Sequence, residues 1–206
     1  MIHDLRDERR VLLVDPKCAQ LEKLRGWSHL WPEYDTKQEL WADDRVSRVM
    51  RTIRDVDFRI VIHFRHSHRQ QLDLLCRMVR VVKNCVLAVD ELGLFIPPGP
   101  AGALPENITS CVVSGTHEGI VLAGTAQRPS LVHATVRAQA TRILFYRMTE
   151  QAEVDVSGRY LGDEFNVAAL PDHVCVDWAD GRASFQDGSY AGKLGNVLPG
   201  ARSARR

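Results

Sequence analysis

Two adjacent acidic residues, Asp90 and Glu91, follow the apolar run 86–89, and this pairing is the strongest chemical signal in the sequence. A continuous apolar run of this length is typical of a strand that is buried on both faces of a parallel sheet. At the carboxyl end of such a strand, one carboxylate can bind Mg²⁺ while the next activates a water molecule. We therefore expect Asp90 to bind the metal and Glu91 to act as the catalytic base. Taken alone, the motif is equally compatible with a buried strand that simply ends in solvent.

A glutamine follows the next predicted strand, residues 119–125, as Gln127 in a Gln-Arg-Pro tripeptide. Because adjacent parallel strands present their carboxyl ends at one edge of the sheet, we expect Gln127 to lie beside Asp90 and Glu91. Its amide could bind a γ-phosphate or orient a water molecule. An isolated glutamine before proline is more often a capping residue, but the spacing from the acid pair favours the phosphate-sensing role.

Strands and helices alternate along the sequence. Short apolar or β-branched runs predict strands at residues 11–14, 59–64, 85–89, 119–125 and 141–146. Helical periodicity predicts helices at about 37–55, 68–83, 104–113, 131–140 and 150–161. A capping box of Thr36 and Glu39 marks the start of the first helix. The alternation predicts a three-layer α/β fold with a mainly parallel sheet, and residues 173–186 add a hairpin around a glycine-containing turn.

The composition suits one α/β domain with small appendages. The chain has 206 residues, 45% of them apolar, and its 27 basic and 26 acidic residues leave a net charge near zero. The overall charge therefore does not indicate a nucleic-acid or membrane partner, and any DNA contact must come from a local patch. The five cysteines form no Cys-x-x-Cys pair, the first residues are charged, and no apolar stretch approaches about 18 residues. We expect a cytoplasmic protein without a transmembrane segment or lipid anchor.

In this order, the motifs resemble the FtsK- and HerA-type P-loop ATPases, and most of all their zonula-occludens-toxin-like and DNA-packaging phage members. Residues 11–17 are similar to the family's second core strand, residues 86–91 to its Walker B strand and residues 124–129 to its sensor strand. The strand 142–147, with an acidic helix start beyond it, is similar to the family's next element. The resemblance covers residues 11–161.

The resemblance implies a RecA-like ATPase core over residues 1–170, a hairpin appendage over 171–198 and a disordered tail over 199–206. It implies ATP and Mg²⁺ as ligands and DNA as a partner, moved by homo-oligomeric rings. By the same resemblance, Asp90 and Glu91 bind nucleotide and serve hydrolysis, and Gln127 senses the γ-phosphate.

Two departures from the family are visible. The family places a Walker A loop, G-x-x-x-x-G-K-[ST], before the strand that corresponds to residues 11–14, because backbone N–H groups and a lysine hold the phosphates there. Ten residues precede Val11 and none is glycine, so we expect the first βα unit to be absent. The segment 188–194 is no substitute, since its glycines are one residue too close and no Ser or Thr follows Lys193. Thr116 stands where similar phage-type proteins carry an arginine before the histidine.

The missing loop leaves three hypotheses about activity. The first is an ATPase domain that is inactive as this chain and binds Mg-ATP at about millimolar affinity or worse, equivalent to roughly 4 kcal/mol or less. The second is a non-catalytic remnant that binds DNA or takes part in a ring. The third, less favoured, is a Mg²⁺-dependent nuclease in which Asp15, Asp90 and Glu91 hold paired metal ions.

The loop after the predicted strand 59–64 is rich in cationic side chains. Arg65 and Arg69 are possible contacts to DNA phosphates, and a solvated charge patch explains them equally well. His63, His66 and His68 could bind a transition metal through their imidazole nitrogens. Because no carboxylate or cysteine stands at ligand spacing, we expect them to be surface histidines.

Overall fold

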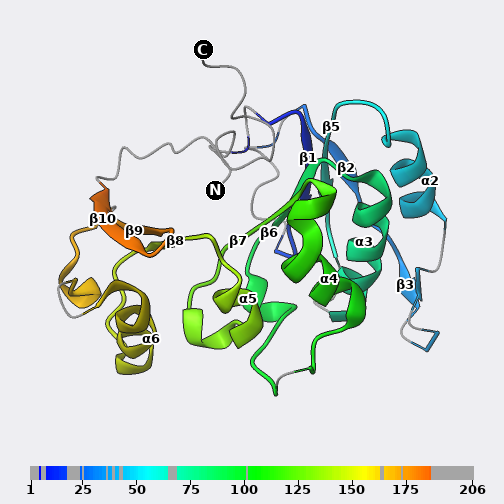
Figure 1. Cartoon of the computed structure of the whole chain (residues 1–206). Helices are drawn as coiled ribbons and strands as arrows, with labels where there is room; N and C mark the ends of the chain where they lie inside the picture. Colours follow the sequence, from blue (N-terminus) through cyan, green and yellow to red (C-terminus); the bar gives the residue numbers. More distant parts are fainter. Residues whose placement is uncertain are drawn as a thin grey trace, which may run out of the picture.

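A five-stranded parallel sheet forms the centre of the molecule (Figure 1). In the computed structural model the strand order is β2-β5-β1-β6-β7, and every hydrogen-bonded pair is parallel. The strands are, in that order, Ser28–Leu30, Phe58–Ile62, Arg10–Val14, Cys85–Val89 and Ile120–Gly124. The structure describes residues 5, 8–17, 24, 26–35, 37–38, 40–41, 44–64, 69–100, 102–162, 165–172 and 174–186. The predicted α/β fold with a mainly parallel sheet is confirmed.

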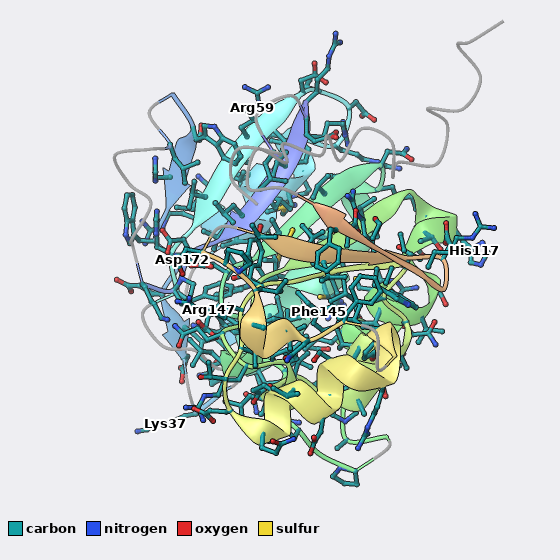
Figure 2. The ribbon with its side chains drawn as sticks, turned by 90° about the vertical axis from the view of Figure 1, so that its left-hand side faces the viewer. Lys37, Arg59, His117, Phe145, Arg147 and Asp172 are labelled. Atoms are coloured by element: carbon teal, nitrogen blue, oxygen red, sulfur yellow. The ribbon has the colours of Figure 1, made fainter. Side chains whose placement is uncertain are left out.

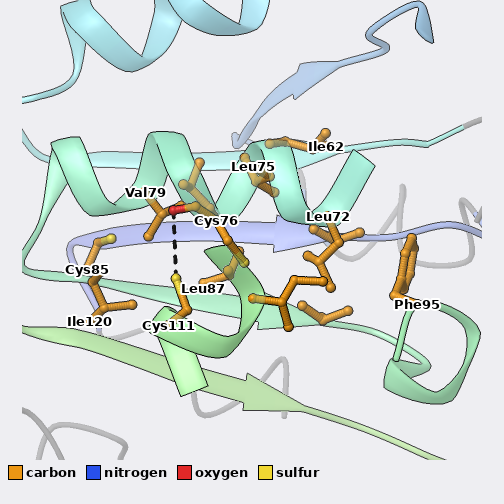
Figure 3. Packing of buried hydrophobic residues seen from close by; sticks show 14 of the residues in the cluster. Ile62, Leu72, Leu75, Cys76, Val79, Cys85, Leu87, Phe95, Cys111 and Ile120 are labelled. Atoms are coloured by element: carbon orange, nitrogen blue, oxygen red, sulfur yellow. Dashed lines mark hydrogen bonds between the residues drawn. The ribbon is translucent and has the colours of Figure 1, made fainter. Parts of the chain in front are cut away.

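Three helices cover one face of this sheet (Figure 1). They are α2 (Arg45–Thr52), α3 (Arg69–Val82) and α4 (Glu106–Ser114). Alternate strand residues point to this face and join the helices in the largest apolar cluster. Figure 3 shows Leu72 and Val79 of α3 in this cluster with Leu87 of β6. Helices α3 and α4 also meet in the core, where the Cys111 thiol donates to the Cys76 carbonyl oxygen over 3.7 Å.

The opposite face of the sheet carries a second, smaller apolar cluster. In it Leu13, Val61 and Ala88 of the strands meet Leu5 and Leu24. All these side chains are buried, so the central strands are covered on both faces as a parallel sheet requires. Within the described part of the chain, no helix has the length and apolar character needed to cross a membrane.

A separate three-stranded antiparallel sheet follows, with the order β10-β9-β8. Its strands are Arg142–Phe145 (β8), Cys175–Ala179 (β9) and Arg182–Gln186 (β10). The predicted hairpin is confirmed, because β9 and β10 are joined by Asp180 and Gly181, whose φ angles of 51° and 76° suit a tight hairpin turn. Helix α6 (Gln151–Leu161) packs on this sheet around Phe145, and Arg147 pairs with Asp172 at 2.6 Å (Figure 2).

The predicted helix over 37–55 is wrong in its first half. A small hairpin of β3 (Tyr34–Asp35) and β4 (Leu40–Trp41) occupies that stretch, and α2 begins only at Arg45. The Asp35 carboxylate accepts hydrogen bonds from the backbone N–H groups of Lys37 and Gln38 at 2.8 and 3.2 Å, a local turn that competes with a helix start. Thr36 and Glu39, the predicted capping box, lie outside the described residues.

Three further elements differ from the sequence prediction. The predicted helix 131–140 is a 3₁₀ turn, η3 (Pro129–Leu131), followed by the short helix α5 (Ala134–Ala138). The predicted strand 141–146 forms as β8, but it joins the hairpin and not the parallel sheet. Strand β2 was not predicted, because three residues are too few to show a period. The predicted tail 199–206 lies outside the described residues.

Candidate functional site

The carboxyl ends of the parallel strands place polar residues side by side. Asp15 follows β1, Asp90 follows β6 and Thr125 follows β7. The ladder continues into these residues, because the N–H of Asp90 donates to the Val14 carbonyl at 2.9 Å and that of Thr125 to the Val89 carbonyl at 3.1 Å. Their backbone positions are therefore set by the sheet and not by a loop.

Thr125 links the two adjacent acids. Its hydroxyl donates to Asp90 Oδ1 at 2.7 Å and accepts from the backbone N–H of Glu91 at 3.0 Å. No hydrogen bond from the described residues reaches Asp90 Oδ2. Sequence reasoning did not single out Thr125, although a hydroxyl residue at the tip of the strand next to an acidic strand end was a readable signal.

Glu91 has an unusual backbone conformation. Its φ and ψ of 56° and 62° are left-handed, which costs a non-glycine residue about 1–2 kcal/mol. Its side chain, 17% exposed, contacts Lys17 Nζ through Oε2 at 3.2 Å. Its other oxygen, Oε1, accepts from the backbone N–H of Gln127 at 3.3 Å. These contacts hold the carboxylate over the tips of β1, β6 and β7.

Asp90, Glu91 and Gln127 therefore lie together at one edge of the sheet, as the sequence predicted. The Gln127 side chain is exposed there, and only its backbone contacts Glu91. The catalytic, metal-binding and sensing roles of these residues stay predictions.

The loop that carries Gln127 is bound to helix α6. Arg128 pairs with Glu150 at 2.5 Å, and the backbone N–H of Ser130 donates to Glu153 at 2.9 Å. The Ser130 hydroxyl also donates to Glu153, whose side chain is buried. The position of the predicted sensor thus depends on contacts between η3 and the helix that follows β8.

His63 at the end of β5 is buried, which corrects its expected place on the surface. Its Nε2 lies 2.9 Å from His29 Nδ1, so one imidazole ring donates a hydrogen bond to the other. The Trp31 ring stacks on the His63 ring, with the ring centroids 4.7 Å apart. Burial lowers the pKa of His63 below its usual value, and the nearby carbonyl and carboxylate groups of Asp15 oppose that shift. His66 and His68 lie outside the described residues.

The two predicted DNA contacts have different outcomes. Arg65 lies outside the described residues. Arg69, the first residue of α3, donates to the Ala103 carbonyl at 2.9 Å and so braces the loop before α4. A DNA contact by either residue stays a prediction.

Comparison with known proteins supports the fold assignment. No family model matches the chain, and no curated protein matches its sequence. Among solved structures, the genome packaging NTPase B204 from Sulfolobus turreted icosahedral virus 2, in complex with ATPγS, has a TM-score of 0.60 and 16% identity over 91% of this chain and 98% of that chain. B204 of Sulfolobus turreted icosahedral virus, a DNA-packaging ATPase, has a TM-score of 0.60 and 14% identity over 88% and 98%.

The N-terminal domain of zonular occludens toxin from Neisseria meningitidis has a TM-score of 0.42 and 12% identity over 92% of this chain and 98% of that chain, a likeness too weak to argue from. The B204 structures match nearly end to end, and their likeness rests on the fold and not on sequence. The chain has the α/β fold of the genome-packaging NTPase B204.

Proposed function

We propose that the chain is the ATP-binding and ATP-hydrolysing motor domain of an FtsK/HerA-like DNA translocase or of a phage assembly or packaging protein, inactive as residues 1–206 alone. The observation that carries this proposal is the meeting of Asp90, Glu91, Thr125 and Gln127 at the carboxyl edge of the sheet. B204, which shares the fold, has been captured with ATPγS and with AMPPCP, and these complexes support ATP as the ligand here.

Asp90 is the residue that would hold Mg²⁺ in this proposal. Its Oδ1 is oriented by the Thr125 hydroxyl, and Oδ2 accepts nothing from the described residues. Asp90 is half-buried, and its Oδ2 is the oxygen that would bind the metal. A carboxylate oxygen suits Mg²⁺, because this ion takes oxygen ligands and keeps several of its water molecules. Bound Mg²⁺ would neutralise charge on the transferred phosphoryl group.

Glu91 and Gln127 would act on the attacking water and the γ-phosphate. The Lys17 ammonium and the Gln127 backbone N–H fix both oxygens of the Glu91 carboxylate at the strand tips. The exposed amide of Gln127 lies at the same edge, where it can donate to a phosphate oxygen. Homo-oligomeric rings, DNA as the moved partner and a cytoplasmic location belong to the same proposal.

The inactivity of the isolated chain follows from its lack of a G-x-x-x-x-G-K-[ST] sequence. Backbone N–H groups and the lysine of that loop make most ground-state phosphate contacts in P-loop sites. We therefore expect Mg-ATP to bind residues 1–206 at about millimolar affinity or worse, equivalent to roughly 4 kcal/mol or less.

The test uses calorimetry on the chain and on a fusion in which a strand, a G-x-x-x-x-G-K-T loop and a helix precede residue 1. The fusion should bind Mg-ATP at micromolar affinity and hydrolyse it. In the fusion, Glu91→Gln should lower hydrolysis by about 10²–10⁴-fold and leave ATP bound, because only the water-activating carboxylate is lost. Glu106→Gln, an exposed acid in the first turn of α4, is the matched control and should change neither quantity. Unchanged hydrolysis in the Glu91 variant would contradict the proposal.

The lack of the phosphate loop also favours the second candidate, a non-catalytic DNA-binding or ring-forming remnant. That candidate requires salt-dependent DNA binding or ring assembly by residues 1–206 without nucleotide. The nuclease hypothesis gains no support, because the described residues contain no group of three His, Cys, Asp or Glu side chains that could hold a metal ion.

A further inference from the structure

Exposed arginines line the outer surface of helices α2 and α3, which lie next to each other over the same face of the large sheet (Figure 1). The buried residues of α2 point to the sheet, whereas Arg45, Arg48 and Arg51 are exposed. At 3.6 residues per turn, these three arginines lie within about 120° of the helix circumference, on the side away from the sheet. In α3, Arg77 is exposed and lies opposite the buried side of that helix. We call these four residues the arginine face.

The arginine face carries more positive than negative charge. Arg48 forms an ion pair with the exposed Asp44 at 2.7 Å. No carboxylate of a described residue lies within ion-pair distance of Arg51 or Arg77. Asp73, the acid of α3, accepts hydrogen bonds from two backbone N–H groups at the start of α4 at 2.9 and 3.0 Å, so its carboxylate is bound to that helix start. The positive charge of the face is therefore a local feature of a chain whose net charge is only +1.

The chemistry and spacing of the arginine face suit the phosphate groups of a nucleic-acid duplex. A guanidinium group binds a phosphate through paired N–H donors, which makes arginine a common phosphate ligand. With a rise of 1.5 Å per residue, Arg45 and Arg51 are about 9 Å apart along the helix axis, and the phosphates of one DNA strand recur every ~3.4 Å along the duplex axis. The face can therefore contact about two or three successive phosphates. A membrane surface suits it less, because α2 exposes no large apolar side chain that could enter a bilayer.

We infer that the arginine face is the surface on which this chain binds the phosphate backbone of double-stranded DNA. The exposed acids that follow α2, Asp55 and Asp57, come after its last turn and lie outside the face. Because contacts to phosphates carry no base information, this binding is independent of DNA sequence. The face lies on the layer of helices, whereas Asp90 and Glu91 lie at the carboxyl edge of the sheet, so a nucleotide bound there does not occupy it. The inference rests on the proposed function for DNA as the partner, and on the positions and charges of the arginines for the surface.

The test measures binding of a fluorescein-labelled DNA duplex of mixed sequence to the full chain by anisotropy, without nucleotide, at salt concentrations from about 50 to 200 mM. In the variant Arg51→Gln/Arg77→Gln, we expect the Kd to rise at least about fivefold and the slope of log Kd against log salt to fall by about 2, because two phosphate contacts are lost. The control Arg159→Gln/Arg182→Gln removes the same charge from exposed arginines of α6 and β10 and should change neither quantity. Because all four side chains are exposed, both variants should keep the thermal midpoint of the wild type.

Equal weakening of DNA binding by the two variants would overturn the inference, because overall charge and not the arginine face would then decide binding. A Kd and salt slope unchanged by Arg51→Gln/Arg77→Gln would overturn it as well. Binding to phosphatidylserine vesicles without binding to DNA would also overturn it, since the face would then fit a lipid surface. DNA binding that does not depend on the face would leave DNA as the partner in the proposed function, whereas no DNA binding at any salt concentration would remove both. Neither result alters the Mg-ATP test of the fusion, so the two failures are distinguishable.

Discussion

Thr125→Val tests the candidate site most directly, because it removes one oxygen and keeps the shape of the side chain. The hydroxyl donates to the charged Asp90 at 2.7 Å and accepts from the Glu91 N–H at 3.0 Å. Losing a hydrogen bond to a charged group typically costs about 1.5–3 kcal/mol, and leaving an N–H unsatisfied about 1–3 kcal/mol. All three residues are only half-buried, so water replaces part of each bond. We expect a loss of about 2 kcal/mol in the free energy of unfolding.

Urea unfolding followed by tryptophan fluorescence measures this loss. With an m-value of about 2–3 kcal/mol per molar, the midpoint should fall by roughly 0.7–1 M at an unchanged slope. Thr125→Ser keeps the hydroxyl and should lose less than half as much. Thr52→Val is the matched control, because Thr52 is exposed and its hydroxyl donates to the Arg48 carbonyl of the same helix, and it should cost less than about 0.5 kcal/mol. A Thr125→Val midpoint equal to that of the wild type would refute the assignment of this hydroxyl.

Three further predictions concern the elements around the site. Arg10 donates to five backbone carbonyls just after the ends of α2 and α3. Arg10→Met should therefore lower the free energy of unfolding by about 2 kcal/mol, which thermal unfolding would show as a lower midpoint. Arg9→Met is the control and should leave the thermal midpoint nearly unchanged, because the Arg9 side chain is 82% exposed. Glu153→Gln weakens the buried carboxylate that holds η3, and limited proteolysis should then cleave the loop after β7 faster than in the control Glu106→Gln, an exposed acid in the first turn of α4. Equal cleavage would argue against this brace. His63 is faced by His29 and Asp15, and its pKa is lowered chiefly by burial, so on acidification the unfolded chain takes up the proton before the folded chain does. The free energy of unfolding should therefore fall as the pH drops below about 6.5, and His63→Phe should reduce this fall. An equal fall in the variant would mean that another group causes the pH dependence.

Local pattern was enough to predict most of the elements that carry the site. The acid-tipped strand formed as β6, and the strands before and after it formed as β5 and β7 within a residue or two of the predicted bounds. Helices α3, α4 and α6 also formed where the apolar period predicted them. These segments were predictable because a helix with one buried face leaves an apolar period in the sequence, and a fully buried strand leaves a continuous apolar run.

Prediction failed where a distant partner or a competing turn decided the structure. Trp41 fits a helical apolar period, yet it lies in β4 and packs on Phe64 with ring centroids 5.5 Å apart. The Asp35 turn already occupies the backbone that the helix start would need. His63 lies at the end of a predicted strand, and its burial depends on His29 and Trp31 from the unpredicted β2 region.

The sequence by itself determined that two carboxylates end a buried strand and that Gln127 follows the next one, because residue type and local spacing carry that information. Only the tertiary structure decided which groups these residues meet. The Thr125 hydroxyl reaches Asp90 across 35 positions, and Lys17 reaches Glu91 across 74. Such contacts depend on strand order, and so does the division of these strands between a parallel and an antiparallel sheet. Strand order results from hydrogen bonding and packing between segments far apart in the chain, which no local period records.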